Sequence, residues 1–80
     1  MQSDAPFENK LGSLLRRFRR DKEETQGDMA SKLGISVSYL CQIEKGGREL
    51  TPTIYNKVLS EYRVTTEEKR SFEKAWRGEA

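Results

Sequence analysis

The feature that most constrains this chain lies at residues 25–46, where a single glycine separates two helix-length amphipathic stretches. Thr25 can cap the first stretch, because its hydroxyl can accept a hydrogen bond from a free N–H of the first helical turn. Gly34 ends that stretch, since glycine readily adopts the left-handed conformation that closes a helix. Ser36 caps the second stretch, Val37 to Lys45. The residues expected to face inward are Met29, Ala30, Leu33, Ile35, Leu40 and Ile43. The segment therefore predicts a helix, a tight turn and a second helix.

Three further amphipathic helices are predicted around this segment. The first covers residues 7–20, after Pro6; another opens at Thr51, followed by a proline; the last opens at Thr65, which forms a capping box with Glu68. No stretch alternates with period two, so we expect no strand and an all-α, five-helix fold. The apolar faces comprise Leu11, Leu14, Leu15 and Phe18, then Ile54, Val58, Leu59 and Tyr62, then Phe72, Ala75 and Trp76.

Composition excludes several classes of function. The 80 residues suffice for one domain, and 34% hydrophobic residues allow one small core. Histidine is absent and Cys41 is the only cysteine, so a disulfide within the chain, a zinc site and the commonest general base are ruled out. We expect no enzyme, no cofactor and no metal, and a cytoplasmic location, because the chain has neither a signal-peptide layout nor a membrane-length apolar stretch. Cys41 is expected to be a buried or half-buried small residue rather than a redox sensor.

A short helix, a glycine-containing turn and a second short helix make up a helix-turn-helix. This segment resembles the phage-repressor, Cro and Xre-like (Cro/C1-type) helix-turn-helix regulators. The resemblance covers most of residues 11–64 and implies a compact, lambda-repressor-like bundle, so we expect the DNA-binding domain at residues 7–64. From the residues themselves we expect a flexible N-terminus at residues 1–6 and, at residues 65–80, a C-terminal helix for packing or dimerisation. The matching positions are Gln26, Ala30, residues 33–36, Ile43, Glu44 and Gly46, with Leu11, Gly12, Leu15, Arg16 and Arg19 upstream and Arg48 downstream.

By this resemblance, the helix that begins at Val37 is the recognition helix and lies in the DNA major groove. Val37, Ser38 and Gln42 are then expected to reach base edges, with Gln42 as the main hydrogen-bonding reader. Glutamine can pair bidentately with adenine, whereas valine can offer only apolar contact. Tyr39 is assigned to the same face, although it could equally cover the edge of the core.

The resemblance also implies residues that hold the DNA backbone and one structural ion pair. Gln26 and Ser36 lie at predicted helix N-termini, which favour a phosphate. The remaining backbone contacts are expected at Lys45, Arg48 and Arg16. In this family an arginine of the first helix pairs with a glutamate of the recognition helix, which here gives Arg19 with Glu44.

Some residues depart from the family pattern, and the overall charge says little about nucleic-acid binding. Glu24 stands where the family usually has an apolar residue, and Gly27 should cost its helix up to about 1 kcal/mol. The net charge is only +2. The other basic residues around Arg16 are flanked by Asp21, Glu23 and Glu24, which favours a solvated helix face over a nucleic-acid patch.

Phe72 and Trp76, four residues apart on the last helix, are expected to form a dimer interface, with internal packing as the alternative. The whole pattern predicts a sequence-specific transcriptional regulator, foremost a repressor that binds a pseudo-palindromic operator as a homodimer. An activator that contacts RNA polymerase is not distinguished from it. The alternative is an antitoxin that binds a toxin protein and represses its own operon. No membrane association is expected.

Overall fold

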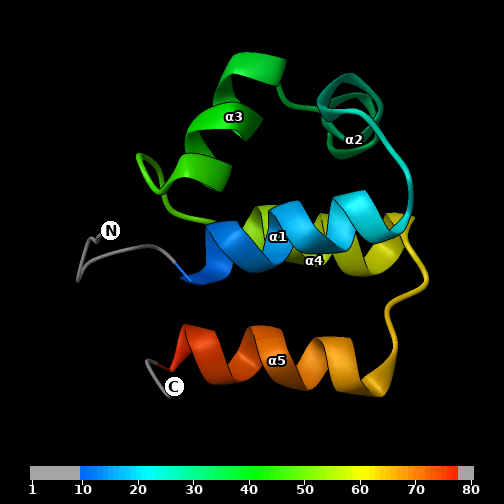
Figure 1. The fold of residues 1–80 in the computed structure, drawn as a ribbon, viewed down its shortest axis with the longest axis vertical. Coiled ribbons are helices and arrows are strands. Elements are labelled where there is room, and N and C mark those ends of the chain that lie inside the picture. The colour runs from blue at the N-terminus through cyan, green and yellow to red at the C-terminus, as the bar shows by residue number, and fades with distance from the viewer. Residues whose placement is uncertain (1–9, 78–80) are drawn as a thin grey trace.

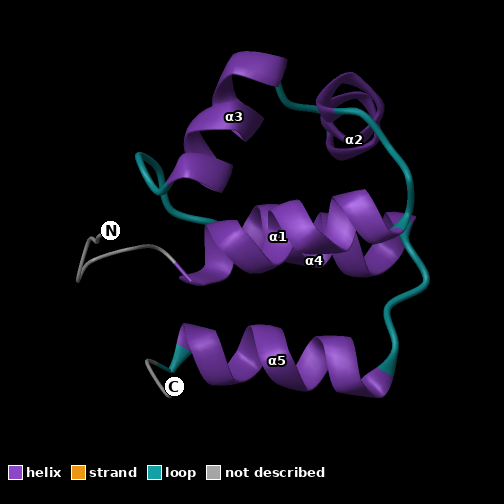
Figure 2. Ribbon diagram, viewed as in Figure 1, coloured by secondary structure: helices purple, strands orange, loops and turns teal. Residues whose placement is uncertain are grey.

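The computed structural model describes residues 10–77, and this part of the chain is built from helices without a strand (Figures 1 and 2). The predicted helix start at Pro6 and Phe7 lies outside the described residues, as do residues 1–6 and 78–80 of the predicted terminal segments. The all-α prediction is confirmed for the described part. Its five helices are α1 (Lys10–Asp21), α2 (Gln26–Leu33), α3 (Val37–Lys45), α4 (Pro52–Glu61) and α5 (Thr66–Trp76).

The helix ends follow the capping signals in the sequence. The hydroxyls of Thr25, Ser36, Thr51 and Thr65 each accept a hydrogen bond from a backbone N–H in the first turn of the helix that follows. Two of these caps are reciprocal capping boxes, one with Asp28 and one with Glu68. Gly34 and Gly46 close α2 and α3 in the left-handed conformation, at φ values of 72° and 90°. Each of these ends is decided by residues close to it in sequence.

Helix α1 is the centre of the arrangement. It packs against α3 on one side and against α5 on the other, while α2 packs against α3 and α4. Figure 1 shows α5 running antiparallel to α1, with α2 and α3 together on the opposite side of α1. The two helices of the predicted helix-turn-helix therefore form one end of the molecule, and the other three helices support them.

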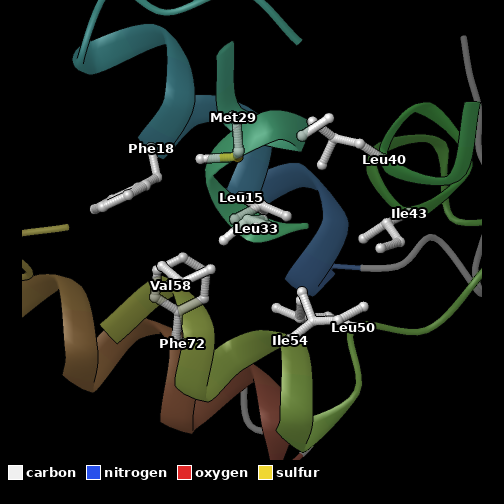
Figure 3. Close-up of a cluster of buried hydrophobic side chains, with 11 residues drawn as sticks. Leu15, Phe18, Met29, Leu33, Leu40, Ile43, Leu50, Ile54, Val58 and Phe72 are labelled. Atoms are coloured by element: carbon white, nitrogen blue, oxygen red, sulfur yellow. The ribbon is translucent and has the colours of Figure 1, made fainter. Parts of the chain in front are cut away.

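All five helices contribute to a single core, in which apolar side chains converge on Leu15 and Leu33 (Figure 3). Leu50, which lies between α3 and α4, is also buried there. Leu59, predicted on the apolar face of α4, is only half-buried. The buried apolar residues are Leu15, Phe18, Met29, Ala30, Leu33, Leu40, Ile43, Leu50, Ile54, Val58 and Phe72.

Phe72 corrects the expected dimer interface. Its side chain is only 2% exposed, and its ring centre lies 5.9 Å from that of Phe18 and 5.6 Å from that of Tyr55. The interior of the chain itself therefore buries Phe72, which leaves it no surface for a second copy. Trp76 is different: it lies against Tyr55 with ring centres 5.2 Å apart and remains 37% exposed.

Gly12 allows α1 and α3 to approach closely. A Cβ added at this position would overlap the backbone carbonyl oxygen of Ile43. No rearrangement of a side chain could relieve this contact, because the obstructing atoms belong to the backbone. The depth at which α3 sits on the rest of the bundle thus depends on the missing side chain of Gly12.

Candidate nucleic-acid interface

The outer face of α3 is open to solvent. Val37 is 48% exposed, and Ser38 and Gln42 lie one helical turn apart on the exposed side. On the inner side, Leu40 and Ile43 are fully buried in the core. The helix is thus anchored along one face while the three side chains assigned to base reading remain available to a partner.

Tyr39 and Cys41 occupy the borders between these two faces. Tyr39 is half-buried and packs against the core, and its backbone N–H donates to the Ser36 hydroxyl at 3.0 Å. Of the two roles considered for Tyr39, the structure therefore shows the covering of the core edge. Cys41 is a half-buried free thiol.

Behind α3, Glu44 is held by two other helices. The guanidinium of Arg19 donates to both of its carboxylate oxygens, from Nε at 2.8 Å and from Nη2 at 3.1 Å. Gln26, at the start of α2, donates its side-chain amide to Glu44 Oε1 at 3.1 Å. The side chains of Arg19 and Glu44 are only 11% and 2% exposed. A bidentate pair this well shielded from solvent holds α1 in a defined position relative to α3. The hydrogen bond from Gln26 connects α2 to the same carboxylate.

Arg19 also reaches the loop between α1 and α2, where its Nη1 donates to the carbonyl oxygen of Glu24 at 2.8 Å. The hydrogen bond with Glu44 raises the pKa of the Arg19 guanidinium, against the opposing effect of burial and with the help of the Glu44 charge. Arg19 therefore stays charged and joins three segments of the chain. The pairing of Gln26 with Glu44 was not anticipated, because the sequence had indicated only a phosphate role for Gln26.

A shallow hollow opens beside this pair, between α1 and the end of α3. It is lined by Arg16, Arg19, Gln26, Glu44 and Lys45. Arg16 and Lys45 are exposed, and Glu44 is the only acidic residue among the five. The lining therefore carries an excess of positive charge, which attracts an anion such as a phosphate. Three residues assigned to the DNA backbone, Arg16, Gln26 and Lys45, are brought together here.

Arg48 lies beyond α3 and makes contacts that the sequence did not reveal. Its Nε donates to the side-chain oxygen Oε1 of Gln42 at 3.0 Å, and its guanidinium carbon lies 5.5 Å from the centre of the Tyr39 ring. The turn at Gly46 brings Arg48 back beside α3. The prediction that Arg48 follows the recognition helix gave no sign of this pairing, since a contact across a helix C-cap depends on the path of the turn.

Glu24, the main departure from the family pattern, is compensated by polar contacts. Tyr62 donates its hydroxyl to one carboxylate oxygen, and Lys32 forms an ion pair with the other. Burial acts to raise the pKa of the Glu24 carboxyl, but the hydrogen bonds and the charge of Lys32 outweigh it, so the pKa lies below its usual value. Burial and the hydrogen bond to Glu24 raise the pKa of the Tyr62 phenol. Glu24 is thus an ionised residue with partners, where an apolar residue would have packed.

The geometry agrees with a comparison against known protein families, in which residues 10–72 match the model of a helix-turn-helix domain. The match spans all of α1 to α4 and most of α5. The chain belongs to this helix-turn-helix family. A comparison with curated proteins found no match.

This helix-turn-helix domain is of a kind that binds DNA, which agrees with an α3 that is supported from behind and exposed in front. Among residues 10–77, no helix has the length and apolar character needed to cross a membrane. The same residues contain no group of three or more side chains suited to hold a metal ion.

Proposed function

We propose that this chain is a sequence-specific transcriptional regulator of the Xre, Cro and phage-repressor type, and that α3 is its recognition helix. The observation that carries this proposal is the two-sided character of α3. Leu40 and Ile43 are fully buried, while Val37, Ser38 and Gln42 are exposed along the opposite side. A recognition helix needs this combination, because it must be held firmly and still project into the major groove.

In this proposal, Ser38 and Gln42 hydrogen-bond to base edges, and Val37 makes apolar contact, for instance with a thymine methyl. Tyr39, at the border of this face, contributes a further contact to the DNA. These contacts give sequence preference, whereas contacts to phosphates give register and orientation.

Phosphate contacts are assigned to residues that flank α3. Arg16 and Lys45 line the positively charged hollow, and Gln26 and Ser36 lie at the N-terminal ends of α2 and α3, where the helix dipole favours a phosphate. Arg48 adds a positive charge after α3. Because each contact releases counterions, affinity should fall steeply with salt concentration.

We further propose that the protein is a repressor that binds a pseudo-palindromic operator as a homodimer. A short recognition helix reads few base pairs, and dimers of this class bind two half-sites about one helical turn apart. With Phe72 in the core, Trp76 is the remaining residue for the dimer contact. Repression requires only that a promoter-overlapping site be occupied.

The proposal is tested by selecting bound duplexes from a random pool and sizing the resulting complex. We expect the wild-type protein to enrich one pseudo-palindromic sequence with two copies bound. The double variant Ser38→Glu, Gln42→Glu should lose this binding, because it places two carboxylates against the DNA. A control, Ser60→Glu, Ser71→Glu, makes the same change in net charge at two exposed positions outside α3 and should bind normally.

Two outcomes would contradict the proposal. One is a wild-type protein that enriches no sequence, and the other is a Ser38→Glu, Gln42→Glu variant that keeps its helical circular dichroism and still binds as the wild type does. A single copy on every selected duplex would contradict the dimer alone.

A further inference from the structure

The turn after α3 places Arg48 against Gln42 through both backbone and side chain. The backbone carbonyl of Gln42 accepts hydrogen bonds from the N–H groups of Gly47 and Arg48, at 2.8 Å and 3.2 Å. The side chains meet above this turn, where Arg48 Nε donates to Gln42 Oε1 at 3.0 Å. Two residues six apart in sequence are therefore joined twice.

The position of the Arg48 guanidinium is also defined from a second side. It lies over the ring of Tyr39, 5.5 Å from the ring centre, and Tyr39 itself packs against the core. An arginine over an aromatic face gains cation–π attraction in addition to its hydrogen bonds. Arg48 is thus held by a half-buried ring on one side and by the Gln42 amide on the other.

This contact decides which end of the Gln42 amide faces away from the turn. A guanidinium carries only donors, so its partner must be the carbonyl oxygen and not the NH2 group. The NH2 group lies at the other end of the planar amide. The contact uses one of the two acceptor lone pairs of Oε1, whereas both N–H donors of the amide face away from Arg48 and favour a ligand that accepts hydrogen bonds.

We propose that Arg48 is a positioning residue that sets the base preference of Gln42, so that Gln42 reads guanine and not adenine. This inference rests on the proposed function. Bidentate pairing with adenine requires the glutamine to accept from N6 and to donate to N7, whereas guanine offers two acceptors, O6 and N7. Arg48 occupies one of the two acceptor sites of Oε1 and places its positive charge beside it, which weakens acceptance from adenine N6 and favours donation by the NH2 group to guanine.

The inference assigns Arg48 a role that differs from that of a phosphate contact. A residue that only neutralises a phosphate carries no sequence information, so its loss weakens binding to all duplexes alike. A residue that orients the Gln42 amide changes preference at one base pair when it is lost. The two roles are separated by the pattern of selected sequences.

The test compares duplexes selected from a random pool by the wild type, Arg48→Ala, Gln42→Ala and the double variant. We expect the wild type to select guanine at the base pair that loses its preference in Gln42→Ala. In Arg48→Ala, the ratio of guanine to adenine at that position should fall by about fivefold or more, the lower limit for one bidentate pair. The double variant should match Gln42→Ala, because Arg48 acts through Gln42.

Two further variants separate geometry from charge. Arg48→Lys keeps the positive charge but lacks the planar guanidinium that lies over the Tyr39 ring, so it should weaken the guanine preference, though less than Arg48→Ala does, while retaining more of the salt dependence. Lys45→Ala removes a neighbouring exposed cation and should weaken all sequences evenly. All of these positions are exposed, so the fold should survive each change.

Uniform weakening by Arg48→Ala, with guanine preference intact, would overturn the inference and leave the proposed function standing. Selection of adenine by the wild type at the Gln42-dependent position would also overturn the inference and leave the proposed function standing. A wild type that enriches no duplex, or a Gln42→Ala variant with an unchanged selected sequence, would instead overturn the role of Gln42 as a base reader and the inference with it.

Discussion

The hydroxyl of Tyr62, at the end of α4, donates a hydrogen bond to the carboxylate of Glu24, in the loop between α1 and α2, at 2.5 Å. Lys32 completes this contact by pairing with the other carboxylate oxygen, while its ammonium lies 4.9 Å from the centre of the Tyr62 ring. The three residues join the start of the helix-turn-helix to α4. They do so through a carboxylate that must stay ionised.

Stability should therefore decrease in acid. Against burial, which acts to raise it, the hydrogen bonds and the charge of Lys32 hold the pKa of the Glu24 carboxyl below its ordinary value of 4.5 in the folded protein. A depressed carboxyl pKa stabilises the fold above the unfolded pKa, and this contribution is lost as the pH falls through the folded pKa. Urea unfolding of the wild type should show stability that declines below pH 4.5, and Glu24→Gln should reduce this decline.

The decline should not vanish in Glu24→Gln, because Asp28 contributes to it. Hydrogen bonds from the backbone and side chain of Thr25 lower the pKa of Asp28 in the same way. Tyr62→Phe is the matched control: it removes the hydroxyl alone and should also flatten the acid dependence. An acid dependence that is identical in all three proteins would show that Glu24 does not contribute as described.

Loss of Glu44 should be severe. Glu44→Ala leaves the shielded charge of Arg19 without its partner, and we expect a loss of about 3–5 kcal/mol in the free energy of unfolding. The double variant Arg19→Met, Glu44→Leu removes both charges and should recover most of this loss. Thermal and urea unfolding measure both effects.

The exposed pair of Lys57 and Glu61 provides the control. These side chains approach to 3.9 Å and are far more accessible than Arg19 and Glu44. Glu61→Ala should change stability by no more than about 0.5 kcal/mol. If Glu44→Ala were as mild as Glu61→Ala, the pair behind α3 would not have the structural role assigned to it.

Gly12→Ala should destabilise the protein, because its Cβ would overlap the Ile43 carbonyl and push α1 from α3. Overpacking of this kind costs about 1–3 kcal/mol, and the backbone cannot yield as a side chain would. Gly27→Ala makes the same chemical change in α2, where the nearest atom is the Thr25 hydroxyl oxygen at 3.6 Å. Gly27→Ala should instead increase the free energy of unfolding, by at most about 1 kcal/mol. Opposite shifts in melting temperature are expected, and a stable Gly12→Ala protein would contradict the close approach.

Phe72 and Trp76 should behave differently when they are truncated. Phe72→Ala opens a cavity in the core and should cost about 3–5 kcal/mol. Trp76→Ala removes a partly exposed ring and should cost less. If Trp76 forms the dimer contact, sedimentation should show weaker self-association for Trp76→Ala at unchanged helicity. A Phe72→Ala protein as stable as the wild type would contradict the burial of α5 against α1.

Local signals explain what the sequence predicted well. The capping boxes at Thr25 and Thr65 and the glycine stop at Gly34 involve residues within one turn of each other, so the pattern alone located those helix ends. The exposed side of α3 followed from helical periodicity. The position of Arg19 opposite Glu44 came only through the family resemblance.

Long-range contacts explain what the sequence did not predict. Glu24 and Tyr62 are 38 residues apart, so their pairing emerges only from the packing of α4 against α2. Phe72 has the spacing of an amphipathic stripe whether it faces the core or a second copy, and the sequence offered no means to decide. The pairing of Arg48 with Gln42 depends on the path of the turn at Gly46.

The manner in which Glu44 is held has a consequence for how the protein meets a duplex. Because side chains of α1 and α2 both donate hydrogen bonds to this one carboxylate, α3 has little freedom to tilt or slide on its own. An imperfect fit would have to be accommodated by bending of the DNA or by rotation of surface side chains. Tolerance for variant binding sites should therefore follow the deformability of the duplex more than any plasticity of the protein.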